Sequence, residues 1–163
     1  MALGGVIFDW DGVVINSASL HEKSWEMLAN ELGLSLPTDH FVHGFGKRNE
    51  IIIPQILKWT QNQDEISLWG RRKEELYRDL GKAKGIPILD GVRTLLQSLA
   101  RDEIPCVIGT STEKNNLSLA FEQLKIGHFF SGSVCSEDVT RGKPDPEVFL
   151  KAAQIINQAP RNC

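Results

Sequence analysis

Two aspartates one residue apart, Asp9 and Asp11, are the residues of this sequence best suited to carry out chemistry. They follow the apolar run 5–8 and precede Gly12, in the order Asp-Trp-Asp-Gly. One carboxylate can attack an electrophilic centre and become covalently modified, while a second can donate and accept protons. Carboxylate oxygens are also ligands that hard cations such as Mg²⁺ prefer. The pair therefore predicts nucleophilic, acid–base or metal chemistry.

The same motif has two simpler interpretations. Aspartate and glycine favour turns for local conformational reasons, so the motif alone is equally compatible with a turn. A calcium-binding loop needs oxygen ligands at its first, third and fifth positions and glycine at its sixth. Here the fifth position is Val13 and glycine is already the fourth residue. The calcium loop is excluded, whereas the turn stays open.

Short apolar segments are the elements that must position these carboxylates. Residues 5–8 and 104–108 lack polar alternation, which is typical of strands buried on both faces of a parallel sheet, and residues 133–135 form a weaker third strand. Helical patterns follow the second and third strands. We predict an α/β fold with a Rossmann-like parallel sheet core. Asp9 and Asp11 then lie beyond the carboxyl end of the first strand, where ligands of such sheets bind.

The segment after the first strand has helical periodicity throughout. Ser19 and Glu22 have capping-box spacing ahead of a helix over 20–32. Pro54 is expected to kink or delay the next helix. A long helix is predicted over 64–80, and residues 81–87, with two glycines and a proline, predict a linker.

This change of pattern predicts an insertion into the α/β core. The sequence from residue 88 returns to alternating strands and helices, with Asp90 placed to cap the helix that follows. We therefore predict an all-helical cap over residues 16–87, inserted in a core of residues 1–15 and 88–163.

Three further residues at strand or helix ends suit a phosphate ester. Phosphoryl transfer needs hydrogen-bond donors on the phosphate oxygens and a cation. Thr110 and Ser111 follow the second strand, and Lys143 lies in Gly-Lys-Pro-Asp-Pro ahead of a helix. Taken singly, the Thr-Ser pair fits a helix cap and Lys143 fits a solvated lysine. Their order after Asp-x-Asp-Gly predicts a phosphoryl-transfer site.

On these motifs the chain resembles the haloacid dehalogenase (HAD) superfamily of phosphohydrolases, in the group with β-phosphoglucomutase and phosphoglycolate-type phosphatases. The resemblance implies that Asp9 is the nucleophile, Asp11 the general acid/base, Thr110 the phosphate-binding hydroxyl and Lys143 the phosphate-neutralising cation. It also implies a Mg²⁺ cofactor, held by the Asp9 carboxylate and the Asp11 backbone carbonyl, and a small phosphate ester as substrate.

The same resemblance indicates candidates in the predicted cap. His21 lies where mutase-like members couple cap closure to acid–base chemistry. Lys47 lies where they place an arginine for a distal phosphate, with Arg48 beside it. A lysine is a point charge and lacks the bidentate fork of arginine. The alternatives are a surface histidine and a solvated basic loop. Trp10 is expected to pack on the opposite side of the strand from the two aspartates.

One part of the family pattern is missing. The family has a fourth motif, an acidic pair after a fourth strand that lies beside the first, and this sequence ends at Cys163 where that strand should start. We expect a truncated product, or a chain completed by another copy or partner. The first strand would then have an unpaired edge, and metal affinity would fall because an anionic ligand is lacking.

Composition excludes several classes of function. The chain has 163 residues, a formal net charge of −3 and no basic tract, so we expect neither nucleic acid nor an anionic membrane as partner. No apolar run approaches the roughly 20 residues of a membrane span. Three cysteines without paired spacing predict reduced thiols. With no targeting segment recognised, we expect a cytoplasmic protein. Monomer and dimer stay open.

The leading functional prediction is a Mg²⁺-dependent phosphatase that acts on a small phosphorylated metabolite, a sugar or polyol phosphate, through an aspartyl phosphate. The first alternative is a phosphomutase resembling β-phosphoglucomutase. The second is a catalytically impaired fragment that binds a ligand or partner, suggested by the missing acidic motif. Haloacid dehalogenation itself is disfavoured, because the second aspartate of Asp-x-Asp marks the phosphotransfer branch of the resembled family.

Overall fold

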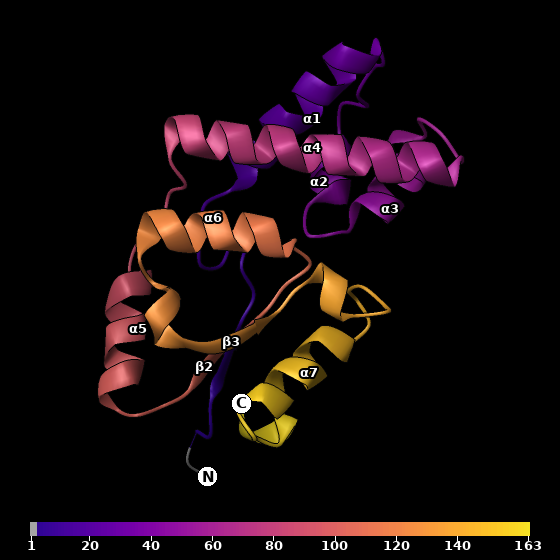
Figure 1. The fold of residues 1–163 in the computed structure, drawn as a ribbon. Helices are drawn as coiled ribbons and strands as arrows, with labels where there is room; N and C mark the ends of the chain where they lie inside the picture. Colours follow the sequence, from indigo (N-terminus) through magenta and orange to yellow (C-terminus); the bar gives the residue numbers. More distant parts are fainter. Residues whose placement is uncertain (1–2) are drawn as a thin grey trace. The chain divides into compact units, whose positions relative to one another are not determined.

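The computed structural model describes residues 3–163, in a chain that divides into two compact units. The core unit comprises Met1–Asn16 and Ile86–Cys163, and the helical unit comprises Ser17–Gly85. Figure 1 follows the chain through both units by colour. The boundaries of the helical unit lie within two residues of the segment predicted as an insertion.

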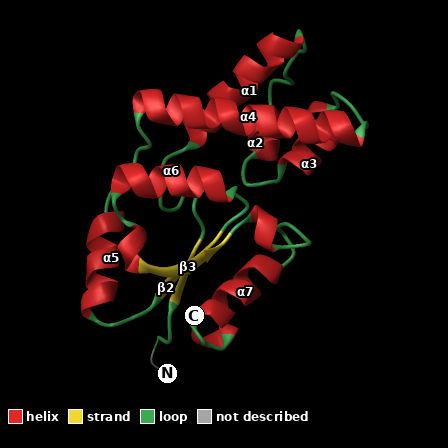
Figure 2. Cartoon of the chain, in the orientation of Figure 1, coloured by secondary structure: helices red, strands yellow, loops and turns green. Residues whose placement is uncertain are grey.

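A three-stranded parallel sheet forms the centre of the core unit (Figure 2). The strands β1 (Val6–Phe8), β2 (Cys106–Gly109) and β3 (Phe130–Val134) lie in the order β1-β2-β3. Val6 pairs with Cys106, and Cys106 pairs in turn with Phe130. The predicted parallel sheet is confirmed. The third strand begins at Phe130, three residues earlier than predicted, because pairing with β2 overrides the weak strand propensity of Ser131, Gly132 and Ser133.

Apolar side chains on both faces of the sheet bind it to helices. On one face, Ile7 and Val107 pack with Val148 and Ala152 of α7 (Glu147–Ile155). The other face carries aromatic contacts. Trp10 is fully buried, with its ring 5.5 Å from that of Phe121 in α6 (Lys114–Leu124). Trp10 therefore packs in the interior, as the sequence predicted.

The remaining elements of the core unit are one helix and three short 3₁₀ turns. Helix α5 spans Val92–Arg101, and the turns are η2 (Gly127–Phe129), η3 (Ser136–Asp138) and η4 (Pro160–Asn162). The prediction that Asp90 caps α5 is wrong, since the N-cap is Gly91, whose φ of 81° is accessible to glycine at little cost.

The helical unit contains two long helices that pack against each other, α1 (Ala18–Leu32) and α4 (Gln63–Lys84). Two short helices, α2 (His40–Gly44) and α3 (Asn49–Ile51), precede a π-helical turn, η1 (Ile52–Leu57). The core of the unit is an apolar cluster: Trp25, Leu28, Ile52, Ile53, Leu57, Ile66 and Leu76. Trp59 and Trp69 pack against it, in agreement with the expectation that the tryptophans of this segment are structural.

Three local predictions for the helical unit need correction. The capping box of Ser19 and Glu22 is wrong, because α1 begins at Ala18 after an N-cap at Ser17 that makes no side-chain cap bond. The expected kink at Pro54 is a widened π-helical turn, in which a residue without a backbone N–H is tolerated. The linker predicted from residue 81 is helical as far as Lys84. Gly81 is buried, and packing outweighs its low helix propensity.

Candidate functional site

The carboxyl end of β1 places Asp9 beside the predicted cation. The strand ends at Phe8, and Asp9 is the next residue. Asp9 Oδ1 lies 2.7 Å from Lys143 Nζ and accepts a hydrogen bond of 2.8 Å from the backbone N–H of Trp10. The side chains of Lys143 and Asp9 retain 21% and 35% of their exposure. The structure therefore joins two residues 134 positions apart, and leaves both within reach of a ligand.

A tight turn holds Asp11 immediately beyond. The backbone N–H groups of Val13, Val14 and Ile15 all donate to the Trp10 carbonyl, over 2.8–3.2 Å. Gly12 has a φ of 77° and donates its N–H to the Ile15 carbonyl at 2.9 Å. Since a side chain at that φ would be strained, glycine suits the position. The turn interpretation of the motif is thus correct, and it is compatible with the functional one because the turn displays the carboxylate.

The Thr-Ser-Thr segment after β2 runs beside this turn. Thr110 continues the ladder, its N–H donating to the Val134 carbonyl at 2.9 Å, and its hydroxyl accepts the Thr112 N–H at 3.1 Å. Ser111 is half-buried. The Thr112 hydroxyl donates a hydrogen bond to Asp11 Oδ2. Sequence reasoning named Thr110 and Ser111 as candidates and missed Thr112, although all three belong to one polar run at a strand end.

Lys143 lies in a loop whose ends are fixed by carboxylates. Glu147, in the first turn of α7, accepts the backbone N–H groups of Thr140 and Arg141 and pairs with Lys151 at 2.7 Å. The hydrogen bond from Lys151 and those from the two backbone donors lower the pKa of Glu147 to about 2. Asp145 Oδ1 accepts the Glu147 N–H at 3.0 Å, so its carboxylate stabilises the start of α7, whose N-cap is Pro146.

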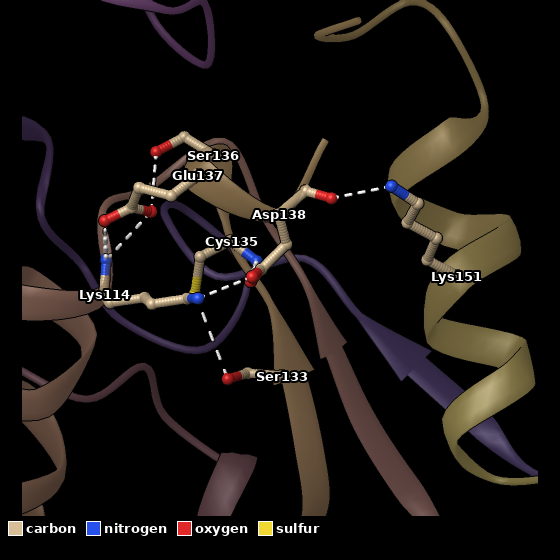
Figure 3. Close-up of polar contacts among 7 residues, drawn as sticks. All are labelled: Lys114, Ser133, Cys135, Ser136, Glu137, Asp138 and Lys151. Carbon is tan, nitrogen blue, oxygen red and sulfur yellow. Dashed lines mark hydrogen bonds and ion pairs between the residues drawn. The ribbon is translucent and has the colours of Figure 1, made fainter. Parts of the chain in front are cut away.

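A network that the sequence did not reveal joins the end of β3 to α6 and α7 (Figure 3). Lys114 pairs with Asp138 at 2.5 Å, and Asp138 Oδ2 accepts the Cys135 N–H at 2.9 Å. Lys151 donates to the Asp138 carbonyl at 2.7 Å. Partial burial would raise the pKa of Asp138, but the hydrogen bonds from Lys114 and Cys135 hold it below its ordinary value. This network fixes the backbone next to Ser136, which donates to the Thr112 carbonyl at 3.1 Å.

The cysteines of the core unit are thiols without a redox partner. Cys106, Cys135 and Cys163 are all free, which agrees with the expectation of reduced thiols. Burial raises the pKa of Cys135 to about 11, so this thiol stays protonated at neutral pH.

The predicted cap candidates belong to the helical unit. His21 Nδ1 lies 2.7 Å from Lys73 Nζ, and its ring stacks on Tyr77 at 4.2 Å. Lys47 is exposed, and Arg48 lies 3.4 Å from Glu50. Lys73, which the sequence analysis did not single out, is almost fully buried on α4.

A carboxylate neighbour compensates the buried charge of Lys73. Glu74 pairs with Lys73 at 2.9 Å and accepts the Asn49 amide at 2.8 Å. Burial would raise the pKa of Glu74, but the electrostatic interactions with Lys73 and His21 outweigh the effect of burial. The pKa is lowered to about 2. Glu74 is therefore ionised, and its charge is compensated by Lys73.

Asp9 and Asp11 are the residues that the sequence predicts as ligands of a metal ion. Within residues 3–163 there is no cluster of three or more His, Cys, Asp or Glu side chains that could hold one. Mg²⁺ is commonly bound by one or two protein carboxylates, with water and substrate phosphate completing the shell. Two aspartates one residue apart at a strand end fit that partial donor set. None of the helices in the described part of the chain has the length and apolar character of a membrane span.

Fold and geometry together define an α/β protein with a polar site at the carboxyl ends of its parallel strands. Residues 6–162 match the sequence family described as haloacid dehalogenase-like hydrolase, and the chain belongs to that family. The predicted family and fold class are therefore confirmed. β-Phosphoglucomutase from Clostridium difficile has a crystal structure that superposes on the whole chain with a TM-score of 0.87, at 25% identity, with 74% of that protein covered.

Curated relatives bear names of phosphatases and a phosphomutase. The chain is 35% identical over 161 residues to 5-amino-6-(5-phospho-D-ribitylamino)uracil phosphatase, chloroplastic, from Arabidopsis thaliana. That match covers 98% of this chain and 43% of the Arabidopsis protein. This chain is also 28% identical to β-phosphoglucomutase of Bacillus subtilis, over 97% of this chain and 72% of that protein. The fructose-1-phosphate phosphatase YqaB of Escherichia coli is 26% identical, with 98% and 83% covered.

Proposed function

We propose that this chain acts as a Mg²⁺-dependent phosphatase on a small phosphorylated metabolite, a sugar or polyol phosphate. The observation that carries the proposal is the pair formed by Asp9 and Lys143, at 2.7 Å, at the carboxyl end of β1. A half-exposed carboxylate beside a lysine suits a nucleophile that must meet a dianionic phosphate, because the lysine neutralises the charge that would otherwise repel the ligand.

In the proposed reaction, Asp9 attacks phosphorus. Both contacts described above engage Oδ1, which leaves Oδ2 as the attacking oxygen. The bond between Asp9 Oδ2 and phosphorus forms while the bond from phosphorus to the ester oxygen breaks. That ester oxygen keeps the electron pair and takes a proton from Asp11. Asp11 then removes a proton from the water that hydrolyses the aspartyl phosphate.

The other core residues bind the transferred group in this proposal. Thr110 and Ser111 offer hydroxyl and backbone donors to phosphate oxygens, and Lys143 supplies positive charge. Mg²⁺, held by Asp9 and the Asp11 backbone carbonyl, would add charge neutralisation when bound. The helical unit would serve as a cap that selects the substrate, with His21, Lys47 and Arg48 as candidates for contact with it.

The substrate class rests on the names of relatives. Besides the proteins above, Escherichia coli hexitol phosphatase A is 29% identical, and a phosphorylated carbohydrates phosphatase of Thermotoga maritima is 24% identical. Their names share a phosphate monoester on a polyhydroxylated carbon chain. A phosphomutase is the second candidate, favoured by the likeness to β-phosphoglucomutase in both fold and sequence.

Phosphate release by the chain from a panel of sugar and polyol phosphates, with and without Mg²⁺, tests the proposal. We expect release that requires Mg²⁺ and falls by at least about 1,000-fold in Asp9→Asn, because the amide cannot form the aspartyl phosphate. Arg141→Gln, which removes an exposed cation near Lys143, is the matched control and should retain activity.

Two other results would each favour an alternative. Interconversion of sugar phosphates that depends on a bisphosphate activator, without net release of phosphate, would favour the phosphomutase. A folded protein that neither releases nor transfers phosphate would favour the binding fragment and reject both enzymatic proposals.

A further inference from the structure

We infer that Thr112 is a positioning residue for the proposed acid/base Asp11, an inference that rests on the proposed phosphatase function. Its hydroxyl donates to Asp11 Oδ2, across 101 positions of the sequence. Thr112 is 8% exposed, so solvent competes weakly for that hydroxyl. The proposed phosphate-binding groups are those of Thr110, Ser111 and Lys143. Thr112 has no part among them.

The backbone of Thr112 is held on both sides. Its N–H donates to the Thr110 hydroxyl at 3.1 Å, and its carbonyl accepts the Ser136 N–H at 3.1 Å. Thr110 itself is tied to β3 through its bond to Val134. The hydroxyl of Thr112 therefore comes from a segment anchored to two strands, and a donor on such a rigid support can orient its acceptor.

Asp11 is held in a complementary way. Its backbone lies in the tight turn formed around the Trp10 carbonyl, which leaves rotation of the side chain as its main freedom. A hydrogen bond to Oδ2 restricts that rotation and so fixes the direction in which the carboxyl group faces. A carboxyl group held in this way can deliver a proton to the ester oxygen as the phosphorus–oxygen bond breaks.

Thr112 differs from Thr110 in what its hydroxyl contacts. The Thr110 hydroxyl is occupied as an acceptor within the segment, whereas the Thr112 hydroxyl is directed to the carboxylate of a different loop. Removing the Thr112 hydroxyl should therefore change proton delivery more than phosphate binding. The predicted signature is a loss that depends on how much the leaving group needs a proton.

Two substrates separate proton delivery from the other steps. p-Nitrophenolate is a stable anion and leaves p-nitrophenyl phosphate without protonation. The glycerol alkoxide that leaves glycerol phosphate must be protonated as it leaves. The ratio kcat/KM reports the steps up to formation of the aspartyl phosphate, so later hydrolysis does not enter the comparison. Wild type, Thr112→Val, Thr112→Ala and Thr112→Ser are measured with both substrates in the presence of Mg²⁺.

We expect Thr112→Val to lower kcat/KM for glycerol phosphate about 10-fold, which corresponds to the loss of one hydrogen bond. The value for p-nitrophenyl phosphate should fall less than about 3-fold. Thr112→Ser keeps the hydroxyl and should restore the wild-type ratio between the two substrates. Thr94→Val, the same change at an exposed site of α5, should behave as wild type.

Equal losses for both substrates, or no loss, in a folded hydroxyl-deletion variant would overturn the inference. Circular dichroism establishes folding, and Thr112→Ala replaces Thr112→Val if the valine variant does not fold. Failure of the proposed function is distinguishable, because the wild-type chain would then hydrolyse neither substrate in a manner that depends on Asp9. That result rejects the inference together with the phosphatase.

Discussion

The core unit and the helical unit each contain a lysine–carboxylate pair, in opposite surroundings. Lys143 and Asp9 meet at a strand end with 21% and 35% of their side chains exposed. Lys73 and Glu74 meet inside the helical unit with 3% and 7% exposed. The two separations are similar, 2.7 and 2.9 Å. Distance therefore does not distinguish the two pairs, whereas access to solvent does.

The physical consequences of the two pairs should differ accordingly. A buried pair that loses one partner leaves an uncompensated charge in a region of low polarity, which is strongly destabilising. A half-exposed pair that loses one partner leaves a charge that water can solvate, so stability changes little. The loss of one partner of such a pair should instead weaken the binding of a charged ligand. Stability and turnover thus separate the two roles.

The largest expected effect on stability is that of Glu74→Ala. We expect a loss of about 3–5 kcal/mol in the free energy of unfolding, because Lys73 stays buried without its carboxylate. Urea denaturation followed by tryptophan fluorescence measures this, since Trp25, Trp59 and Trp69 of the four tryptophans lie in the helical unit.

The neighbouring Glu75 provides the matched control for that measurement. Glu75 is 54% exposed and pairs with Arg72 at 3.0 Å. Glu75→Ala should cost about 1 kcal/mol or less, as exposed pairs do. Similar losses for both variants would show that burial does not set the value of the pair, and the contrast between the units would then fail.

Lys143→Gln should show the opposite balance. We expect kcat/KM for phosphate release to fall on the order of 100-fold, because one group that stabilises phosphate charge is removed. The free energy of unfolding should change by less than about 1 kcal/mol. A large loss of stability with unchanged turnover would place this pair in the same structural class as Lys73 and Glu74.

The smallest expected effect is on thermal stability at acid pH. It concerns Glu147, which fixes the loop that carries Lys143. The pKa of Glu147 is lowered to about 2 from an ordinary value of 4.5. Because its pKa is depressed in the folded state, the stabilisation by Glu147 is complete above pH 4.5 and is lost as the pH falls towards 2. Melting temperatures of wild type and Glu147→Gln should therefore differ at pH 6 and converge by pH 2 to 3.

The difference at pH 6 should be a few degrees at most, since the carboxylate is near the surface. Circular dichroism at a series of pH values provides the melting temperatures. A constant difference across the whole range would show that Glu147 acts through packing of α7 and not through its charge.

The sequence was most informative where chemistry depends on neighbours along the chain. Asp9 and Asp11 are ordered by the end of β1 and by Gly12, and their position as strand-end carboxylates followed from a few consecutive residues. Trp10 was placed correctly in the interior for the same reason, because side chains alternate along a strand. The G-K-P-D-P segment likewise indicated both a lysine and the start of a helix.

Elements whose bounds depend on packing were predicted less well. Helix α4 continues through Gly81 because that residue is buried, and local propensity contains no record of its neighbours. Strand β3 begins as early as Phe130 because Phe130 pairs with Cys106 of β2. In both cases a weak local preference was overridden by contacts between segments that are distant in the sequence.

By itself, the sequence determined the order of motifs, the parallel α/β core and the helical character of the inserted segment, and it indicated the two carboxylates as candidates. Only the tertiary structure decided that Lys143 meets Asp9, that Thr112 contacts the Asp11 carboxylate, and that Lys73 and Glu74 are buried together. The reason is physical. Periodicity and turn chemistry act over a few residues, whereas burial and charge pairing depend on which distant segments the fold brings into contact.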